Sequence, residues 1–537
     1  MASIPRTPMP RVVIAASTGT VFEFYDFLLY GSLAMFFGSL FFPPGNDTAA
    51  LLASLATFGA GFAVRPLGAV IFGRLGDRVG RKRTFLVTIV LMGLSTALVG
   101  VLPTFEQIGW WAPALLVTLR LVQGLALGGE FGGAAIYIAE HCGPERRGFF
   151  TSFIQTTGSL GLLLSLGVIL VCRAALGEEA FREWGWRIPF LLSVLLLGLS
   201  VYVRLQIAES PLFEAIRQRG ELSGSPVRES LLGSANRARM GAALVVAAAM
   251  ATSWYTAQFY SLVFLQTALQ VDSTTAAAVI GIAVLAGLGL FVLAGALSDR
   301  IGRRPVMLAG MLLTALAVIP AYKTMLGVGN PALEAAQRAS PVTVHAEPTR
   351  FSPFARASTL DDATRVRDAL AKRGISYANA SPATAPVPGV PVVIRIGGAN
   401  GTTLTGFDPA RLDAALAAAG YPTASAVPPL RTIGDLQPLH MTLVACLLTM
   451  ILGAALTCGP GAGWLAELFP TRIRYTSLSV PYHLTSAWFG GFMPLTAAWL
   501  VARSGDVLAG LWYPVVVMGI AFLLALRWMP ETRGQAL

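Results

Sequence analysis

Charged side chains occur inside stretches of the sequence that are otherwise almost entirely apolar. In the first such stretch Glu23 and Asp26 stand three residues apart and Tyr30 follows four residues later, so we expect all three on one face of a helix. Arg65 lies in the second stretch, directly before Pro66, which favours a kink. An ionisable group inside a bilayer costs about 3 kcal/mol or more, so each of these positions indicates a binding site or a proton relay.

The fourth apolar stretch carries two stripes of residues with different chemistry. The polar stripe consists of Arg120, Gln123 and Glu130, which the helical repeat brings to one side. The adjacent stripe consists of glycines spaced four residues apart: Gly124, Gly128 and Gly132. Glycines at this spacing allow a neighbouring helix to approach closely. We therefore expect the polar stripe to be held toward an internal cavity.

Aromatic and polar residues in two later apolar stretches complete the set of candidate ligands. Tyr255 and Gln258 share a helix face in one stretch, and Tyr482 and His483 are neighbours in the other. Aromatic residues in membrane helices pack against neighbours more often than they bind ligands. A histidine suits a proton relay, but His483 can equally form a hydrogen bond to an adjacent helix. Both interpretations stay open at this point.

The composition indicates lipid as the main solvent of the chain. Of its 537 residues 55% are hydrophobic and only 12% are charged, about half the charged share of an ordinary soluble domain. The net charge is +11, but no basic tract with interleaved aromatics is present, so nucleic-acid binding is not expected. The cysteines stand singly, at Cys142, Cys172, Cys446 and Cys458. With no paired Cys spacing, Walker-type loop or catalytic constellation, we expect no metal, no cofactor and no enzymatic activity.

Twelve apolar stretches are long enough to cross a bilayer. They lie at 14–41, 51–73, 84–103, 112–139, 149–172, 187–207, 240–269, 274–297, 305–325, 438–460, 476–502 and 508–529. Lys and Arg accumulate in alternate connections, which the positive-inside rule assigns to the cytoplasm. We therefore expect both termini in the cytoplasm.

These stretches divide the chain into two halves of six spans. The expected fold class is an all-α polytopic membrane protein, with two pseudo-symmetric six-helix bundles and a small extracytoplasmic α/β insertion between helices 9 and 10. The expected boundaries are an N-terminal bundle at 1–208, a cytoplasmic central loop at 209–239, helices 7 to 9 at 240–325, the inserted module at 326–437, and helices 10 to 12 with the tail at 438–537.

The insertion at 326–437 is long, polar and free of cysteine. Its sequence predicts a helix over 360–370, a strand over 390–396, a turn over 397–401, and a second helix opened by Asp408 and Pro409 and closed by Gly420. The glycine-rich turn lacks the spacing of a nucleotide-binding fingerprint. The module is interpreted as a shield over the outer mouth or, alternatively, as a capture module for a substrate or partner.

Two charged loops share one spacing of glycine, aspartate and basic residues: Gly73–Lys82 and Gly295–Arg304. These loops resemble the signature loops of the major facilitator superfamily. Four further strings, at 23–27, 184–190, 209–213 and 469–475, resemble its metabolite:proton symporter branch. The resemblance covers essentially the whole chain except 326–437. Typical members of the branch are shorter, so the insertion is the main departure.

The resemblance implies two six-helix halves around a central cavity, alternating access, and uptake of a small metabolite driven by protons. We expect the proton-coupling residues to be Glu23, Asp26, Arg120 and Glu130. Asp26 and Arg120 would form an ion pair in the empty protein, and protonation of Asp26 or Glu23 would release the arginine for an anionic substrate. The alternative is a fixed ion-pair network that holds the N-terminal helices together.

Substrate contacts are expected from arginines, polar groups and aromatic rings of both halves: Tyr30, Arg65, Arg120, Gln123, Tyr255, Gln258, Tyr482 and His483. A guanidinium group matches the geometry of a carboxylate, which favours an organic acid. Zwitterionic osmolytes or amino acids meet the same requirement. A further alternative is a transceptor that senses a ligand through its outer module. We expect a monomer in the bacterial inner membrane, with the lipid bilayer, a small metabolite and a proton as its partners.

The paired loops are expected to form conformational gates. Asp77 and Asp299 can accept hydrogen bonds from the exposed N–H groups of a facing helix terminus. The glycines permit tight turns and close approach of the backbone. The expected gating residues are Gly73, Asp77, Arg78, Gly80, Arg81, Asp299, Arg300, Gly302 and Arg303.

Overall fold

A computed structural model of the chain describes residues 8–43, 47–205, 211–347, 361–387, 389–398, 401–422, 425–535 and 537. Within these residues, 12 helices are long and apolar enough to cross a membrane. The predicted number of spans is therefore confirmed. The predicted boundary between 208 and 209 and the first residue of the predicted helix at 360–370 lie outside the described residues.

The first half contains six of the membrane-spanning segments and several short connecting helices. They are α1 (Met9–Ser32), α2 (Ala34–Phe41), α3 (Asp47–Ala63), α4 (Arg65–Arg78), α5 (Arg81–Gly100), α6 (Phe105–Ile108), α7 (Trp111–Leu127), α8 (Glu130–His141), α9 (Arg147–Leu176), α10 (Glu178–Ala180), α11 (Arg187–Leu191) and α12 (Ser193–Leu205). Two short helices of the central loop, α13 (Pro211–Gln218) and α14 (Pro226–Leu232), lead to the second half.

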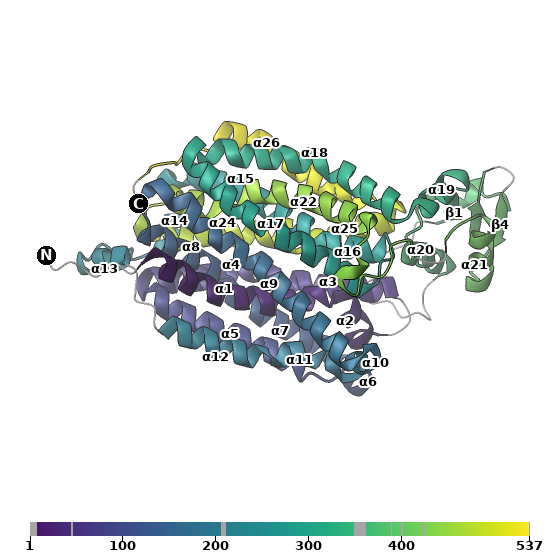
Figure 1. The fold of residues 1–537 in the computed structure, drawn as a ribbon, viewed down its shortest axis with the longest axis horizontal. Coiled ribbons are helices and arrows are strands. Elements are labelled where there is room, and N and C mark those ends of the chain that lie inside the picture. The colour runs from purple at the N-terminus through teal and green to yellow at the C-terminus, as the bar shows by residue number, and fades with distance from the viewer. Residues whose placement is uncertain are drawn as a thin grey trace.

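The second half repeats the pattern of the first. Its helices are α15 (Arg237–Trp254), α16 (Ser261–Thr267), α17 (Ser273–Ile301), α18 (Arg303–Gly329), α22 (Pro438–Cys458), α23 (Gly461–Leu468), α24 (Arg474–Thr485), α25 (Met493–Ser504) and α26 (Trp512–Trp528). The two halves meet where α9 packs on α17 and where α4 packs on α24. The start of α1 and the end of α26 lie at one end of the bundle and the inserted module at the other (Figure 1).

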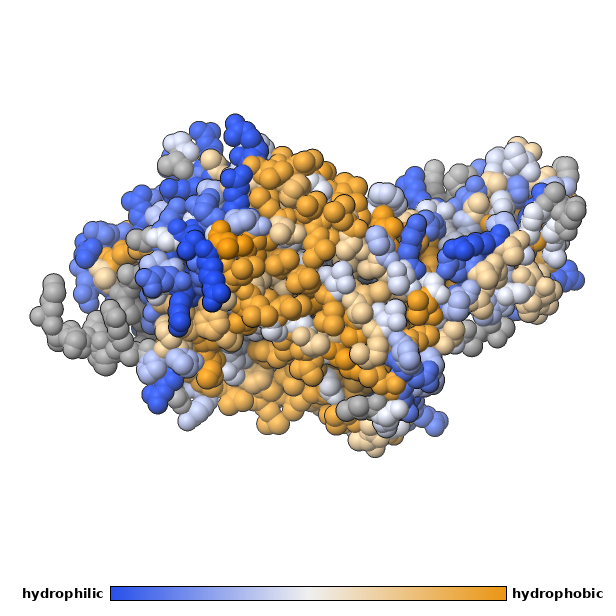
Figure 2. All heavy atoms as spheres, turned by 45° about the horizontal axis from the view of Figure 1, so that its top comes forward, coloured by the Kyte–Doolittle hydropathy of each residue, from blue (hydrophilic) through white to orange (hydrophobic). Residues whose placement is uncertain are grey.

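The surface agrees with a membrane-spanning bundle. A broad apolar band crosses the middle of the visible face, and hydrophilic residues gather toward both ends (Figure 2). Exposed large apolar side chains such as Leu195, Leu285 and Leu523 lie on this band's helices. A soluble protein rarely exposes so large a continuous apolar surface, whereas lipid covers one at no cost.

Several spans are interrupted near their middle, and the interruptions lie beside the candidate residues. The second span breaks at Val64, between α3 and α4, which confirms the kink expected before Pro66. The fourth span breaks at Gly128 and Gly129, so Glu130 begins α8. The seventh and eleventh spans contain π-helical turns at Tyr255–Tyr260 and Ser486–Gly491. Such irregular turns are common at functional sites.

The glycine stripe of the fourth span brings two helices into backbone contact. A Cβ atom at Gly124 would lie 1.6 Å from the carbonyl oxygen of Gly61, and one at Gly128 would lie 2.3 Å from the carbonyl oxygen of Arg65. Neither position has room for a side chain. The close helix approach predicted from the glycine spacing is therefore confirmed, and it fixes Arg65 against the fourth span.

The inserted module contains, within the described residues, a four-stranded sheet of order β2-β1-β3-β4. The strands are β1 (Val342–Ala346), β2 (Tyr377–Ala380), β3 (Val392–Ile396) and β4 (Thr402–Thr405). Strand β1 pairs parallel with β2 and antiparallel with β3. One face of the sheet packs on α19 (Pro331–Ala339), α20 (Asp362–Lys372) and α21 (Pro409–Ala418). The predicted α/β module is therefore present, with three strands that the sequence did not predict.

Candidate transport site

A small cavity lies at the centre of the molecule, between the two halves. Its volume is about 30 Å³, close to the volume of one water molecule. Arg65 and Phe131 line it from the first half, and Trp254, Tyr255 and Tyr482 line it from the second. Any larger substrate requires the halves to move apart.

The guanidinium group of Arg65 is buried at this cavity. The side chain is 2% exposed, and its Cζ lies 3.8 Å from the ring centre of Phe62 and 4.3 Å from that of Phe27. Within the described residues, its Nε and Nη2 donate no hydrogen bond. A buried guanidinium with donors to spare is suited to a planar anionic group that accepts two hydrogen bonds.

Only part of the predicted substrate-binding set lines this cavity. Of that set, Arg65, Tyr255 and Tyr482 do. Trp254, which is outside the set, also lines the cavity, and its Nε1 donates to Ser159 at 3.4 Å. The remaining predicted contacts are buried but do not line it: Tyr30, Arg120, Gln123, Gln258 and His483. Phe131 was missed by the sequence reasoning, although its ring stacks on Tyr482 with centres 3.8 Å apart.

The expected ion pair between Asp26 and Arg120 is absent among the described contacts. Asp26 instead accepts a hydrogen bond of 2.5 Å from the Ser193 hydroxyl. Arg120 donates to Gln123 at 2.6 Å and lies over the ring of Phe27 at 4.2 Å. Residues 26 and 27 point about 100° apart on a helix, so a guanidinium held on Phe27 is turned away from Asp26. That prediction was wrong.

The three polar residues of the first span also diverge. The Tyr30 hydroxyl turns toward α3, where it contacts Ser54 at 3.1 Å. Asp26 turns toward α12 and Glu23 toward α8. The three side chains therefore turn toward three different neighbouring helices, although their spacing predicted one shared face.

Glu23 and Glu130 share one arginine, Arg204, which the sequence reasoning missed. Arg204 forms an ion pair with Glu130, lies over the Phe85 ring at 4.2 Å, and acts electrostatically on Glu23. All three charged side chains are at most 3% exposed. Neither oxygen of Glu23 accepts a hydrogen bond from the described residues. The signal available in the sequence was an arginine near the end of the sixth apolar stretch.

The paired loops contact helix N-termini in the opposite half. Asp77 accepts from the backbone N–H and the hydroxyl of Thr476, at 3.1 and 2.7 Å, at the start of α24. Asp299 accepts from the backbone N–H groups of Gly148 and Phe149, at 2.9 and 2.7 Å, at the start of α9. These contacts have the geometry expected of the loops, and each one bridges the two halves.

The glycines of the two loops meet their expected geometric requirements. Gly80 and Gly302 have φ angles of 120° and 107°, which side chains other than glycine rarely adopt. Among the other expected gating residues, Arg78 donates to the Gly224 carbonyl of the central loop and Arg300 is exposed. The side chain of Arg81 lies outside the described part of the chain.

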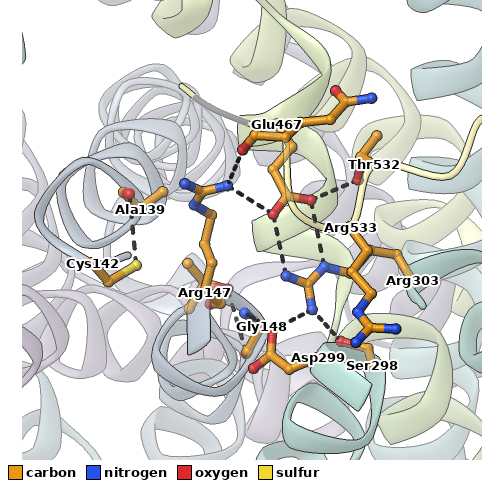
Figure 3. A network of polar contacts seen from close by, with 12 residues as sticks. Ala139, Cys142, Arg147, Gly148, Ser298, Asp299, Arg303, Glu467, Thr532 and Arg533 are labelled. Atoms are coloured by element: carbon orange, nitrogen blue, oxygen red, sulfur yellow. Dashed lines mark hydrogen bonds and ion pairs between the residues drawn. The ribbon is translucent and has the colours of Figure 1, made fainter. Parts of the chain in front are cut away.

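A network of buried charges reinforces the Asp299 contact (Figure 3). Glu467 accepts from Arg147 at 3.0 Å and from Arg303 at 3.2 Å, and Arg303 also binds Asp299 at 2.6 Å. The side chains of Glu467 and Arg303 are fully buried. Arg147 belongs to the first half and the other three residues to the second, so the network joins the halves.

The equivalent pair joins Glu140 of the first half to Arg474 of the second half, at 2.9 Å. Neither glutamate stands out in the sequence, where Arg147 and Arg474 add only to the positive charge of their connections. Yet six residues separate glutamate from arginine in each copy, at Glu140 and Arg147 and at Glu467 and Arg474. That repeat within a duplicated chain was a usable signal.

The C-terminal tail closes the same end of the molecule. Glu531 accepts from the backbone N–H groups of Arg303 and Arg304, at 2.9 and 3.0 Å, at the start of α18. Partial burial raises the pKa of Glu531, but the backbone hydrogen bonds outweigh burial and hold this pKa below its ordinary value. The carboxylate is therefore charged at neutral pH and caps the helix.

At the end that carries the module, aromatic rings close the path between the halves. Phe58 of α3 stacks on Phe259 of the seventh span, with centres 4.7 Å apart and planes 12° apart. A Cβ atom at Gly31 would lie 2.5 Å from the Phe259 ring, so the ring packs directly on α1. Phe62 packs on Gly491 in the same way, at 2.1 Å. The central cavity is thus closed at both ends.

Comparisons with known proteins place these features in context. Residues 27–327 match a family model described as Major Facilitator Superfamily. The chain is 30% identical to the inner membrane metabolite transport protein YhjE of Escherichia coli (strain K12), over 98% of this chain and 95% of that protein. It is 40% identical to the shikimate transporter of the same organism, over 59% of this chain and 72% of that one. It is 35% identical to the proline/betaine transporter of Salmonella typhimurium, over 58% and 64% of the two chains.

A solved structure supports the fold. The proton:xylose symporter XylE bound to 6-bromo-6-deoxy-D-glucose superposes with a TM-score of 0.63, over 98% of this chain and 97% of that one. The sequence identity is 16%, so this likeness bears on the fold alone.

Proposed function

Because the chain belongs to the major facilitator superfamily and is a multi-pass membrane transporter of metabolites, we propose that it carries a small carboxylate together with a proton by alternating access. We place it in the bacterial inner membrane with both termini in the cytoplasm, which the distribution of Lys and Arg supports. The module then lies on the outer side. The observation that carries the proposal is the buried Arg65 guanidinium at a cavity between the two halves.

The anionic substrate follows from the charges around that cavity. Arg65 is the charged residue among the described residues that line it, and no carboxylate lines it to compete. A carboxylate group bound to the two unused guanidinium donors would gain charge-assisted hydrogen bonds. The shikimate transporter, a relative, carries a name consistent with such a substrate.

The proton is assigned to the cluster of Glu23, Glu130 and Arg204. One arginine balances one carboxylate, and an unpaired buried carboxylate costs several kcal/mol. The second carboxyl group therefore holds a proton or loses burial when it ionises. Asp26, which is buried against a neutral serine, is the second candidate.

A chain of contacts connects this cluster to the contact of Asp77 with Thr476, which we call the cytoplasmic latch. Glu130 begins α8, and the carbonyl of the preceding Gly129 accepts from the Tyr475 hydroxyl of α24. The next residue of α24, Thr476, holds Asp77. A shift of α8 on protonation would therefore act directly on the helix terminus that the latch caps. This gives proton binding a mechanical route to the opening of the cytoplasmic side.

Uptake into liposomes tests the proposal. The protein is reconstituted with an acidic exterior, and shikimate uptake is followed with and without a protonophore. We expect accumulation that the protonophore removes, loss of uptake in Arg65→Ala, and weak uptake in Arg65→Lys, which keeps the charge but not the planar fork. Arg182→Ala, an exposed residue of an outer connection, is the control. Accumulation that survives the protonophore would refute proton coupling, and normal uptake by Arg65→Ala would refute the carboxylate site.

Separate substitutions test the two candidate proton sites. Glu23→Gln should leave shikimate exchange intact but abolish accumulation and its dependence on pH. If Asp26 carries the proton, Asp26→Asn should instead be the variant that keeps shikimate exchange but loses accumulation and its dependence on pH. A normal pH dependence in both variants would return these residues to the role of a fixed packing network.

A zwitterionic osmolyte is the second candidate substrate. Aromatic rings surround the cavity beside Arg65, from Phe24, Phe131, Trp254, Tyr255 and Tyr482, and such rings bind quaternary ammonium groups. The proline/betaine relative carries a name consistent with this substrate. Uptake of glycine betaine in the same liposomes, with Trp254→Leu as the diagnostic variant, distinguishes the two. Binding of either compound without uptake would favour the transceptor alternative.

A further inference from the structure

A second, larger cavity lies under the inserted module at the outer end of the bundle. Its volume is about 400 Å³, which is within the range of small-metabolite sites. Ser39 and Leu52 line it from the first half, Tyr260, Gln270 and Ala498 from the second, and Lys372 from the module. All three parts of the protein therefore meet at this cavity.

The outer cavity and the central cavity lie in series along the same helices. In each of two spans, one residue lines the outer cavity, a second belongs to the layer of aromatic rings around Phe58 and Phe259, and a third lines the central cavity. These residues are Leu52, Phe58 and Arg65 in the second span, and Tyr260, Phe259 and Tyr255 in the seventh. The stacked pair of Phe58 and Phe259, with Phe62 beside it, separates the two cavities along these spans. A solute in the outer cavity is therefore separated from the central cavity by these aromatic rings.

The module is held over this cavity by backbone contacts with the second half. The N–H of Tyr377 donates to the Gly505 carbonyl at 2.9 Å, and its hydroxyl donates to the Ala502 carbonyl at 3.1 Å. A Cβ atom at Gly374, just after α20, would lie 2.5 Å from the Ala268 carbonyl oxygen. These contacts fix the end of α20, and with it Lys372, at the cavity wall.

The lining suits a small organic anion. Among the described residues of the lining, Lys372 carries the one formal charge, and Tyr260, Gln266, Thr267 and Gln270 supply polar groups. The Lys372 ammonium is positioned by Asp368, one helical turn earlier, at 3.0 Å. The remaining wall is apolar or small. A carboxylate with a compact carbon skeleton fits this combination of one cation, several donors and apolar sides.

Backbone strain marks the same wall. Among the described residues, Gln270 is the one non-glycine residue with a positive φ, at 56°. Its side chain donates to the Thr267 carbonyl at 2.5 Å, which closes the end of the seventh span. Such conformations cost about 1 kcal/mol or more and cluster at ligand-binding positions.

We propose that this outer cavity is a second binding site for the transported carboxylate, in which Lys372 of the inserted module receives the anion before the aromatic layer opens. The proposal rests on the proposed function for the identity of the anion. It gives the module a role that a plain shield does not have, because the module supplies the charged group of the site.

Equilibrium binding of radiolabelled shikimate to the purified full-length protein tests the site independently of transport. We expect two components in wild-type protein, of which Arg65→Ala removes the central one. The component that remains in Arg65→Ala should weaken by about fivefold on adding Lys372→Gln, the effect of losing one exposed charge contact. Arg411→Gln, the same charge change at an exposed site on α21 of the same module, should leave it unaltered. The outer site is refuted if Arg65→Ala retains no binding component, or if the component that it retains is unchanged on adding Lys372→Gln.

Uptake by the single variants separates this proposal from the proposed function. Lys372→Gln should raise the KM for shikimate by about fivefold with an unchanged maximal rate, and Ala498→Trp, which fills the cavity from α25, should do the same or more. Wild-type uptake with unaltered KM in both variants refutes the outer site and leaves the proposed function intact. Lys372-dependent binding without any uptake refutes the transport proposal and leaves the outer site.

Discussion

At the proposed cytoplasmic end the two halves are joined by carboxylates, guanidinium groups and capped helix termini, whereas at the proposed outer end they are joined by aromatic rings beneath an inserted module. The cytoplasmic contacts are directional and duplicated: Asp77 and Asp299 each cap a helix of the other half. The outer contacts are apolar and rest on the stacking of Phe58 and Phe259. The two gates are therefore sensitive to different perturbations.

This difference suggests a division of labour. Charged contacts are strong when intact and costly when one partner is lost, so they suit a gate that opens in response to a proton. Aromatic stacking contributes about 1 kcal/mol and is easily exchanged for contact with a ligand. The outer gate thus suits admission of substrate, and the cytoplasmic gate suits its controlled release.

Loss of the central carboxylate of the cytoplasmic network should have the largest effect. Glu467→Gln removes the carboxylate that pairs with the buried Arg147 and Arg303. This loss destabilises the closed state by about 3 kcal/mol and shifts the closed-to-open ratio by about a hundredfold. Spin labels at Val79 and Ile301, placed on the two halves in a cysteine-free background, should move apart. Glu145→Gln, an exposed glutamate of a neighbouring loop, is the control. An unchanged label distance would mean that the network does not hold the gate.

Asp77→Asn should have a smaller effect in the same direction. The neutral amide still accepts from Thr476 but loses the interaction of its charge with the terminus of α24, about 1 kcal/mol. The same label pair should show a partial shift. The ratio of shikimate to glycine betaine uptake should stay constant, and an altered ratio would refute the assignment of Asp77 to a latch.

Phe259→Leu should open the opposite end. It removes the stack with Phe58, about 1 kcal/mol, so labels at Trp110 and Trp512 on the outer side should separate while the cytoplasmic pair does not. Phe291→Leu, a buried phenylalanine within the second half, provides the matched control. Movement of the cytoplasmic pair instead would contradict the separation of the two gates.

Glu531 gives the smallest effect and a defined pH dependence. Because its folded pKa lies below the ordinary value, its contribution to stability is present at neutral pH and is lost as pH falls through about 4 and below. The carboxylate is largely exposed, so the contribution is below about 1 kcal/mol. The Tm of Glu531→Gln should be lower than wild type by about 1 °C at pH 7 and equal to it near pH 3. Exposed Glu221→Gln should show no difference at either pH.

The architecture was largely predictable from the sequence, because membrane spans obey simple rules of length and charge. The twelve spans, the kink at Arg65 and the close helix contact at Gly124 all follow from local patterns. In the module, α20, β3 and α21 were predicted to within about two residues. The short strands β1, β2 and β4 were missed because four or five residues give too little periodicity.

The candidate site was less predictable, because it depends on which way each side chain turns. The family resemblance favoured a pair of Asp26 and Arg120, but the guanidinium lies over the ring of Phe27 instead of at the carboxylate. Arg204 looked like an ordinary residue near the end of a span, and only the packed structure brings it to Glu130. Pairing between distant helices has no local signature in one sequence.

The measurement that bears most directly on the account is proton movement during substrate uptake. Wild-type protein is reconstituted into liposomes that contain a pH-sensitive dye. Shikimate is then added outside, with the same pH inside and outside at the start. We predict that the lumen acidifies as shikimate enters, and that Glu23→Gln exchanges shikimate without acidification. Entry of shikimate into wild-type liposomes with no change in lumenal pH would contradict it.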